Sequence, residues 1–394
     1  MIDFQSIFSD ATVSKFNDFS QGVFDKLSRC HTAQMGMHKM RCNDAFCSNE
    51  MYQFHNCNNR NCPNCGGLKK EEWIENRVQE LLPTAYYHLV FTLPHDLNPL
   101  ILGNRKLLFK LLFDASSQTI LSHAKDPRYL GATPSITMVL HTWGQDLSFH
   151  PHVHCIVSGG GFDGEKWVNP KRKKNNFLFP ETSLQNQFKA IFLKQIQALP
   201  LEKQGIDVEK IANDLQKKRW NVYAKAPFGT PSQVMEYLGR YTHKVAITRH
   251  RILSLTPETI SFRYKDYAVA NQQKTMTLTR EEFLRRFEQH ILPKKFTKIR
   301  HYGILQNHGK KARLDKIRAL LELGKLPPKI KIPVQIRMLE KYGKDIFKCP
   351  CCAHGRLETV ISIRFSKSKS EEMREIQDII TRNKASPLQT EQQK

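Results

Sequence analysis

The sequence lacks both a secretory signal and a long uninterrupted apolar run. Its first residues, MIDFQSIFSDATVSKF, have neither the basic start nor the apolar core of a signal peptide. The most apolar long stretch, from Leu100 to Leu121, is interrupted by Asn104, Arg105, Lys106 and Lys110. These polar residues favour an amphipathic helix over a membrane span. We therefore expect a cytoplasmic protein with no membrane partner.

Acidic residues are also scarce. The 394 residues include 37 Asp and Glu against 61 Lys and Arg, which gives a formal net charge of +24. An excess of this size attracts polyanions, and nucleic acid is the usual partner of such a protein. Hydrophobic residues make up 40% of the chain, enough for buried cores, and the length favours two or three domains.

The ten cysteines are unevenly distributed. Six lie between Cys30 and Cys65, three lie between Cys349 and Cys352, and Cys155 stands alone. In a basic cytosolic protein such clusters indicate metal binding in preference to disulfides.

Pairs of cysteines in the N-terminal segment have the spacing of zinc ligands. The strongest pair is the CPNC motif of Cys62 and Cys65, and Cys42 and Cys47 form a looser pair. The predicted ligands of a structural Zn²⁺ ion are Cys42, Cys47, Cys62 and Cys65. The candidate ligands of a second site are Cys30, His38, His55 and Cys57. The two histidines could instead be surface groups near DNA. The C-terminal CPCC motif offers too few ligands for a closed site unless His354 or another segment joins it.

Strand-like and helix-like segments alternate along the chain, which predicts an α+β fold. Strands are expected at 86–94, 135–143 and 149–157, and helices at 99–124 and 181–199. We divide the chain into a zinc-binding DNA-recognition domain (1–82), a catalytic domain (83–310), a basic helical region with the cysteine knuckle (311–365) and a polar, disordered tail (366–394).

Three histidines alternate along the stretch FHPHVHCIVSGGG at 149–161. In a strand His150, His152 and His154 share one face, because successive side chains point to opposite sides. The preceding strand supplies His141 and Gln145, which a hairpin could bring alongside. Neutral imidazoles are good ligands for Mn²⁺ and similar ions. The strand by itself fits either a metal site or an exposed strand that binds nothing.

Two tyrosines lie four residues apart in MEYLGRYTHK at 235–244. On a helix Tyr237 and Tyr241 would share a face, as aromatic pairs of a buried core also do. Their neighbours Arg240, His243 and Lys244 are not residues of a buried stripe. A tyrosine hydroxyl can attack a phosphodiester when a metal stabilises the developing charge.

These motifs together resemble a known family. HPHVHCIVSGGG followed by YAKAPFGTPSQVMEYLGRYTHKVAI resembles the two-tyrosine HUH rolling-circle transposases of the insertion-sequence ninety-one family, where HUH denotes histidine, bulky apolar residue, histidine. The segment NCNNRNCPNC resembles the N-terminal zinc-binding segment of that family, and FLRRFEQHILPKKFTKIRHYGIL extends the likeness. The resemblance covers most of residues 30 to 352.

The resemblance implies an HUH endonuclease core, an antiparallel sheet flanked by helices, with a small N-terminal zinc-binding domain and a helical, basic C-terminal region. It implies that His152 and His154 bind catalytic Mg²⁺ or Mn²⁺ and that Tyr237 and Tyr241 are the nucleophiles. Gln145 has the spacing of a third ligand in related HUH nucleases, and His150 is a candidate for DNA contact. The expected substrates are single-stranded DNA at the ends of the element and target DNA, cleaved through 5′-phosphotyrosine links. Such a protein would be associated with the bacterial nucleoid.

Several basic residues are candidates for binding the DNA. Lys244 is a candidate to steady phosphate charge or to protonate the leaving oxygen. The other candidate DNA contacts are Lys171, Arg172, Lys173, Lys174, Lys225 and Arg240.

Two alternatives stay open at this point. A relaxase or replication initiator of the HUH class would share the chemistry, although such proteins usually carry a helicase domain, and no GxxxxGK[ST] motif is present. A non-catalytic zinc-dependent DNA-binding protein would use the same cysteines and charge, with its histidines and tyrosines idle.

Overall fold

The computed structural model has an α+β fold in which antiparallel sheets are flanked by helices, as the sequence predicts. It describes residues 4–170, 178–201, 205–225, 233–234, 239, 245–267, 269–328, 332–352 and 354–364. Among the helices of these residues, none combines the length and apolarity that a membrane crossing requires.

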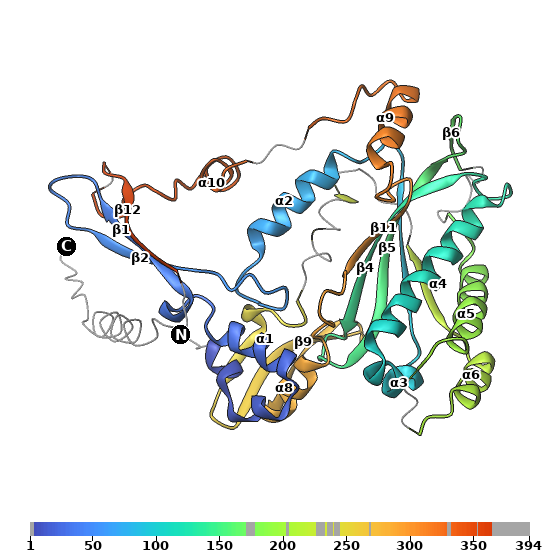
Figure 1. The fold of residues 1–394 in the computed structure, drawn as a ribbon, viewed down its shortest axis with the longest axis horizontal. Helices are drawn as coiled ribbons and strands as arrows, with labels where there is room; N and C mark the ends of the chain where they lie inside the picture. Colours follow the sequence, from blue (N-terminus) through green and yellow to red (C-terminus); the bar gives the residue numbers. More distant parts are fainter. Residues whose placement is uncertain are drawn as a thin grey trace.

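An antiparallel sheet whose strands differ in length forms the centre of the molecule (Figure 1). Its strand order is β11-β4-β5-β3-β7, and the short β6 pairs with β5. The strands are β3 (Tyr86–Thr92), β4 (Thr133–Trp143), β5 (Phe149–Phe162), β6 (Trp167–Val168), β7 (Asn221–Lys225) and β11 (Ile299–Gly303). β4 and β5 form the long hairpin that carries the histidines.

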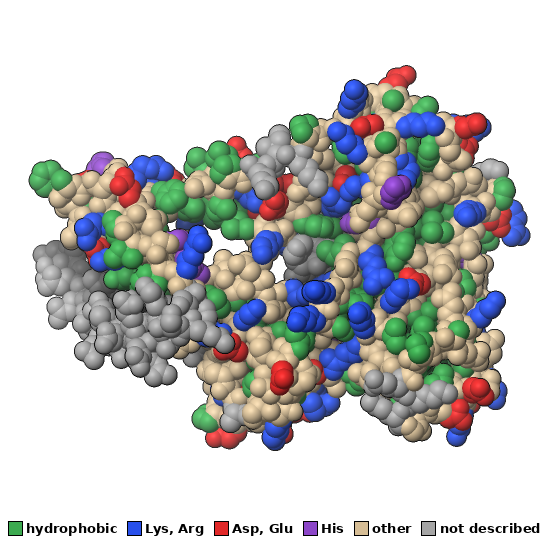
Figure 2. Space-filling model, in the orientation of Figure 1, with side chains coloured by type: hydrophobic (Ala, Val, Ile, Leu, Met, Phe, Trp, Pro, Cys, Tyr) green, Lys and Arg blue, Asp and Glu red, His purple; other side chains and the backbone are tan. Residues whose placement is uncertain are grey.

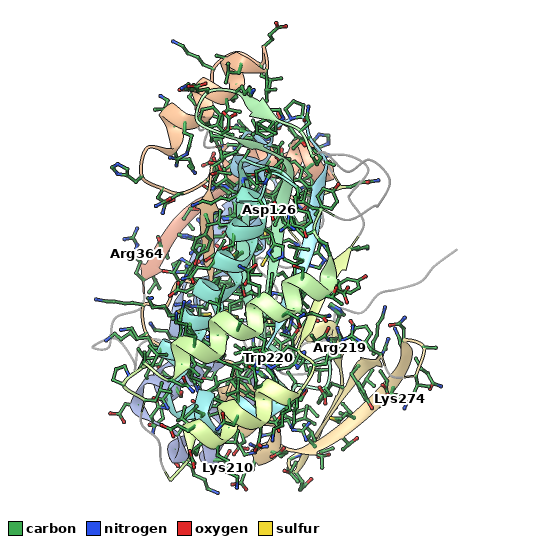
Figure 3. The ribbon with its side chains drawn as sticks, turned by 90° about the vertical axis from the view of Figure 1, so that its right-hand side faces the viewer. Asp126, Lys210, Arg219, Trp220, Lys274 and Arg364 are labelled. Carbon is green, nitrogen blue, oxygen red and sulfur yellow. The ribbon has the colours of Figure 1, made fainter. Side chains whose placement is uncertain are left out.

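One face of this sheet is covered by helices (Figure 1). They are α3 (Asn98–Gly103), α4 (Arg105–Lys125), α5 (Glu181–Ile196) and α6 (Val208–Lys217). The layer between helices and sheet is the largest apolar core, and it includes Val153, Cys155 and Val157 of β5. Trp220 lies under α5 in Figure 3, where its ring packs against Phe188 with centroids 5.3 Å apart.

The predicted helix at 99–124 is divided in two. Asn104 leaves helical geometry, with φ −129° and ψ 36°, and separates α3 from α4. Its side-chain amide donates to the carbonyl of Leu100 at 3.1 Å within the core. Asparagine competes for backbone hydrogen bonds in this way, which makes it a poor residue for a helix interior.

A second sheet lies beside the lower end of the first, with the order β10-β9-β8. It consists of β8 (Ile252–Leu255), β9 (Thr259–Asp266) and β10 (Gln272–Thr279). The N-terminal elements η1 (Phe4–Ser9), η2 (Ala11–Lys15) and α1 (Asp18–Ser28) lie close by with α8 (Arg280–Glu288) and η5 (Arg249–Arg251). A second apolar core joins Phe8 and Phe24 to Phe262 and Phe287. Residues on both sides of the predicted boundary between the zinc-binding and catalytic domains therefore share one core.

A third sheet has the order β12-β1-β2. It is built from β1 (Gly36–Cys42), β2 (Glu50–Phe54) and β12 (Leu357–Arg364), preceded by η3 (Ala33–Met35). Its central strand therefore comes from the N-terminal segment, and one edge comes from the far end of the described chain.

Among the described residues, α2 (Gly67–Val78), α9 (Lys310–Leu320) and α10 (Val334–Tyr342) lie in the segments between the sheets, and η4 (His95–Leu97) lies between β3 and α3. α2 lies on the side of the central sheet opposite α4 and α5 (Figure 1), and the guanidinium of Arg337 on α10 pairs with Glu75 of α2 at 2.8 Å. The predicted helical C-terminal region thus ends in strand β12, which is not among the predicted strands.

Candidate active site and metal centres

The alternating histidines of β5 lie on the face of the central sheet that α4 and α5 do not cover. Val153 and Cys155 point into the helix-covered core, so the period of two places His152 and His154 on the opposite face, as predicted. On the neighbouring strand His141 is paired directly with His152. Ligand nitrogens of His141, His152 and His154 all lie within 4.8 Å of one another. Nitrogens bound to one ion at about 2.1 Å lie about 3.4 Å apart in a tetrahedron, so small side-chain movements would bring the three rings onto one ion.

Hydrogen bonds fix the orientation of two of these rings. Nδ1 of His152 lies 2.7 Å from the carbonyl oxygen of His150, and Nδ1 of His154 lies 2.9 Å from Nε2 of His88. A ring that donates through Nδ1 presents its Nε2 lone pair to a metal. Both histidines are therefore candidate metal ligands through Nε2.

His88 supports His154 from strand β3. Its side chain is buried, and burial lowers its pKa to about 3, helped by the charges of Lys225 and His152. His88 is therefore a neutral acceptor for His154 near neutral pH. Lys225, a predicted DNA contact, is exposed at the end of β7 directly opposite His88 in the strand pairing.

An open cleft of about 740 Å³ lies in front of the histidines. The central sheet contributes the three histidines and Trp143, and the second sheet contributes residues 264–267 of β9 and the following turn. His150 also lines the cleft, and its Nδ1 lies 3.3 Å from Nε2 of His95. Burial and then the charge of His95 lower the pKa of His150, so it faces the cleft mainly as a neutral ring.

Gln145 lies on the rim of this cleft, in the turn between β4 and β5. Its side-chain Nε2 donates to the hydroxyl of Tyr267 at 3.0 Å, and its backbone carbonyl oxygen accepts from the guanidinium of Arg251. The same turn is held by Arg286, which donates to the carbonyl of Asp146 at 3.1 Å. The structure brings His141 to the two HUH histidines as a candidate third ligand, and its position opposite His152 depends on the register of the hairpin.

Residues on either side of the predicted nucleophiles pack on the histidine face. Val234 is buried against Tyr86 and Ile156, in a cluster that also includes Ile74 of α2. A Cβ placed on Gly239 would collide with Cδ1 of Ile74, so this backbone lies directly against α2. Several predicted site residues lie outside the described residues: Tyr237, Tyr241, Lys244, Arg240, Lys171, Arg172, Lys173 and Lys174.

The cysteines form two clusters that differ from the predicted grouping. The first contains Cys30, Cys57, Cys62 and Cys65, with all four sulfurs within 4.8 Å of one another. Sγ of Cys57 lies 3.6 Å from Sγ of Cys65, and Sγ of Cys62 lies 3.5 Å from Sγ of Cys30. Four zinc–sulfur bonds of about 2.3 Å in a tetrahedron give sulfur–sulfur edges of about 3.8 Å. The spacing therefore fits a zinc ion.

The second cluster contains Cys42 and Cys47 together with two cysteines of the C-terminal knuckle, Cys349 and Cys352. Placing Cys42 and Cys47 with Cys62 and Cys65 around one ion was therefore a wrong grouping. Sequence spacing could not reveal it, because the true neighbours are separated by about 300 residues.

His38 and His55 belong to neither cysteine cluster. Their rings contact each other, with centroids 4.5 Å apart, and burial and then the charge of His38 lower the pKa of His55. In the proposed second set of ligands, only Cys30 and Cys57 converge, and they join the CPNC pair.

The chain matches families of known proteins over most of its length. Residues 3–93 match the family model described as "Transposase zinc-binding domain", and residues 135–313 match one described as "Putative transposase". The protein named "Putative transposase y4qJ" of Sinorhizobium fredii is 37% identical over 355 residues, which cover 86% of this chain and 88% of that protein. The chain belongs to the insertion-sequence ninety-one family of transposases.

A second relative is consistent with this assignment. The protein named "Transposase for insertion sequence element IS801" of Pseudomonas savastanoi pv. phaseolicola is 28% identical over 348 residues, covering 85% of this chain and 82% of that protein. No solved structure matches the chain. As a transposase of this family the protein has an N-terminal zinc-binding domain and acts on DNA, which removes the relaxase and initiator alternatives.

Proposed function

We propose that this transposase cleaves and rejoins single-stranded DNA at the ends of its insertion sequence by rolling-circle transfer, with Tyr237 and Tyr241 as nucleophiles. The observation that carries the proposal is the convergence of His141, His152 and His154 within 4.8 Å at the wall of an open cleft. The backbone at Val234 and Gly239, which flanks Tyr237 and precedes Tyr241, packs on the same face of the sheet.

The histidine cluster fits a divalent metal ion. Three imidazoles converge, and the orientation of two is set by hydrogen bonds through Nδ1, as in other metal sites with histidine ligands. An all-imidazole set favours Mn²⁺ over Mg²⁺, because Mg²⁺ prefers oxygen ligands. When bound, the ion would polarise the scissile phosphate and stabilise its developing charge.

The reaction consumes neither water nor a further co-substrate. The hydroxyl oxygen of one tyrosine attacks phosphorus, the bond from phosphorus to the 3′-oxygen breaks, and the products are a 5′-phosphotyrosine and a 3′-hydroxyl. The phenolic proton is lost and the leaving 3′-oxygen gains one, for which Lys244 is a candidate donor. A 3′-hydroxyl then attacks the phosphotyrosine, which restores a phosphodiester and frees the tyrosine. Two tyrosines allow a second strand to be cleaved before the first link is resolved.

Basic side chains lead toward the cleft from the β11 edge of the central sheet. Figure 2 shows Lys and Arg side chains gathered near the middle of this face. Nζ of Lys298 lies 4.9 Å from the ring centroid of Trp143, which stacks on His141 at 4.6 Å between ring centroids. A basic and aromatic path of this kind suits single-stranded DNA, whose bases stack and whose phosphates bind cations.

Removing the histidine ligands is the direct test of this proposal. We expect the wild-type protein with Mn²⁺ to form a covalent adduct with labelled single-stranded element ends on a denaturing gel. His152→Ala/His154→Ala should slow adduct formation by about 10³-fold, since the lost metal contributes several kcal/mol of transition-state stabilisation. His95→Ala, outside the ligand set but in contact with His150, is the control and should form the adduct normally. An unchanged rate in the double variant would remove the metal role from these histidines.

The third ligand can be identified by comparing His141 with Gln145. Losing even an outer partner of a metal ligand weakens affinity roughly 10–100-fold. We therefore expect His141→Ala to weaken Mn²⁺ binding by about 100-fold, measured by calorimetry on the zinc-loaded protein. Gln145→Ala should change it little, because that amide bonds to Tyr267. If Gln145→Ala weakened Mn²⁺ binding more than His141→Ala, Gln145 would be the third ligand, as its spacing in the sequence predicts.

A further inference from the structure

The second cysteine cluster joins the two ends of the described chain. Cys42 ends strand β1 and Cys47 lies in the loop before β2, whereas Cys349 and Cys352 precede β12. We infer that these four cysteines bind a second structural zinc ion, which fastens the C-terminal strand to the N-terminal zinc-binding domain. The two C-terminal ligands lie outside residues 3–93, the part that matches the family's zinc-binding domain.

The sulfur geometry is that of a tetrathiolate site. Sγ of Cys42 lies 3.6 Å from Sγ of Cys352, and Sγ of Cys47 lies 3.8 Å from Sγ of Cys349. These separations match the edges of about 3.8 Å expected around zinc, and they are far longer than the roughly 2.0 Å of a disulfide.

Hydrogen bonds to sulfur support thiolates in this cluster. The backbone N–H of Cys351 lies 3.4 Å from Sγ of Cys349, and the N–H of Gly355 lies 3.2 Å from Sγ of Cys352. The amide of Asn49 donates to Sγ of Cys349 at 3.4 Å. Four thiolates around Zn²⁺ carry a net charge of −2, and N–H donors of this kind offset that charge.

The knuckle between the C-terminal ligands and β12 leaves no room for a side chain at Gly355. A Cβ there would collide with Sγ of Cys42 and would lie 2.9 Å from Cβ of Asp44. The glycine therefore lets the C-terminal backbone approach the N-terminal sulfur closely, as zinc knuckles require.

Apart from the cysteine cluster, strand β12 is attached mainly by hydrogen bonds. It pairs with β1, and the backbone N–H of Asn43 donates to the carbonyl of Arg356 at 2.9 Å. Of its hydrophobic side chains Leu357 is buried, whereas Val360 and Ile361 are about half exposed. A strand that buries so little apolar surface gains little from the hydrophobic effect, so a metal cross-link is the strongest tie available to it.

This second zinc site, formed by Cys42, Cys47, Cys349 and Cys352, is independent of the nuclease chemistry, and its test does not measure activity. With the histidine cluster removed by His152→Ala/His154→Ala, so that its imidazoles bind no zinc, we expect two zinc ions per chain, measured by inductively coupled plasma mass spectrometry. The same background is used for the cysteine variants. Cys349→Ser/Cys352→Ser should contain one, and limited proteolysis should then remove the segment after α10 at least ten times faster. Cys351→Ser is the matched control, because that exposed thiol lies in the same knuckle but outside the cluster, and it should retain both ions.

The wild-type protein provides a test that does not depend on folding of a variant. Replacement of zinc by Co²⁺ should give two equivalents per chain, both with the intense sulfur-to-metal charge-transfer absorption of tetrathiolate sites. Cys352→His should keep two equivalents while changing one site to three sulfurs and one nitrogen. A single tetrathiolate Co²⁺ site per chain in the wild type, or two tetrathiolate sites retained in Cys349→Ser/Cys352→Ser, would overturn the second zinc site.

Discussion

Tyr237→Phe/Tyr241→Phe is expected to reduce covalent adduct formation by more than about 10⁴-fold, while binding of the same single strand stays within about twofold of wild type. Phenylalanine keeps the ring and removes only the nucleophilic oxygen, and loss of a covalent nucleophile costs enzymes factors of this size. Either single variant should still form an adduct, because the other hydroxyl remains. The measurement is a single-turnover time course with labelled DNA.

The cleft itself provides the sharpest control for this prediction. Tyr264 and Tyr267 line it among the described residues, and the hydroxyl of Tyr267 accepts from Gln145. Tyr267→Phe should leave adduct formation within a few-fold of wild type. If it abolished the adduct while Tyr237→Phe/Tyr241→Phe did not, the nucleophile would belong to the second sheet and the motif assignment would be wrong.

Cys62→Ser is expected to remove one zinc ion and to destabilise the protein by several kcal/mol. Cys62 is 2% exposed and Cys30 is fully buried, and both belong to the core that joins the N-terminal helices to the second sheet. Structural zinc contributes directly to folding, so its loss should unfold this region. Zinc content and thermal unfolding measure the effect.

A buried cysteine elsewhere separates metal loss from ordinary core damage. Cys155 is fully buried in the central core and belongs to neither cluster. Cys155→Ala should therefore lower stability modestly and leave the zinc content unchanged. Full zinc content in Cys62→Ser would show that the cluster of Cys30, Cys57, Cys62 and Cys65 is not a metal site.

Local periodicity was enough to predict the histidine strand. The alternation of HPHVH specifies which residues share a face whatever the rest of the fold does, and Val153 and Cys155 lie in the core as that rule requires. The partner of the histidines was harder to predict. His141 reaches His152 through the register of the hairpin, and that register shifts near Trp143, which spacing in the sequence does not reveal.

The predicted grouping of the cysteines is wrong because it also depends on strand pairing, here between segments far apart in the sequence. Ligand spacing identifies pairs such as Cys62 and Cys65, which are close in sequence, but not which pairs meet. Cys42 and Cys352 are 310 residues apart and are brought together by the pairing of β1 with β12. The sequence LETVISIR of β12 is rich in β-branched residues and is strand-like, but it does not reveal that its partner is β1.

The predicted domain boundaries stay predictions, and the structure adds that the segments they separate share sheets and cores. Phe24 of the N-terminal segment packs on Phe287, with ring centroids 5.9 Å apart. Figure 3 shows Lys274 on the β9–β10 hairpin, apart from the helices that cover the central sheet. The wall of the cleft opposite the histidines therefore depends on packing between the second sheet and residues from the start of the chain.

Mapping the covalent link by mass spectrometry tests the central claim most directly. Wild-type protein is allowed to react with a single-stranded element end in Mn²⁺, the DNA is trimmed by nuclease, and the modified peptide is sequenced. The expected product is a peptide with a nucleotide attached through its 5′-phosphate to Tyr237 or Tyr241. A nucleotide on any other residue, or cleavage of the strand with no covalent peptide at any time, would contradict it.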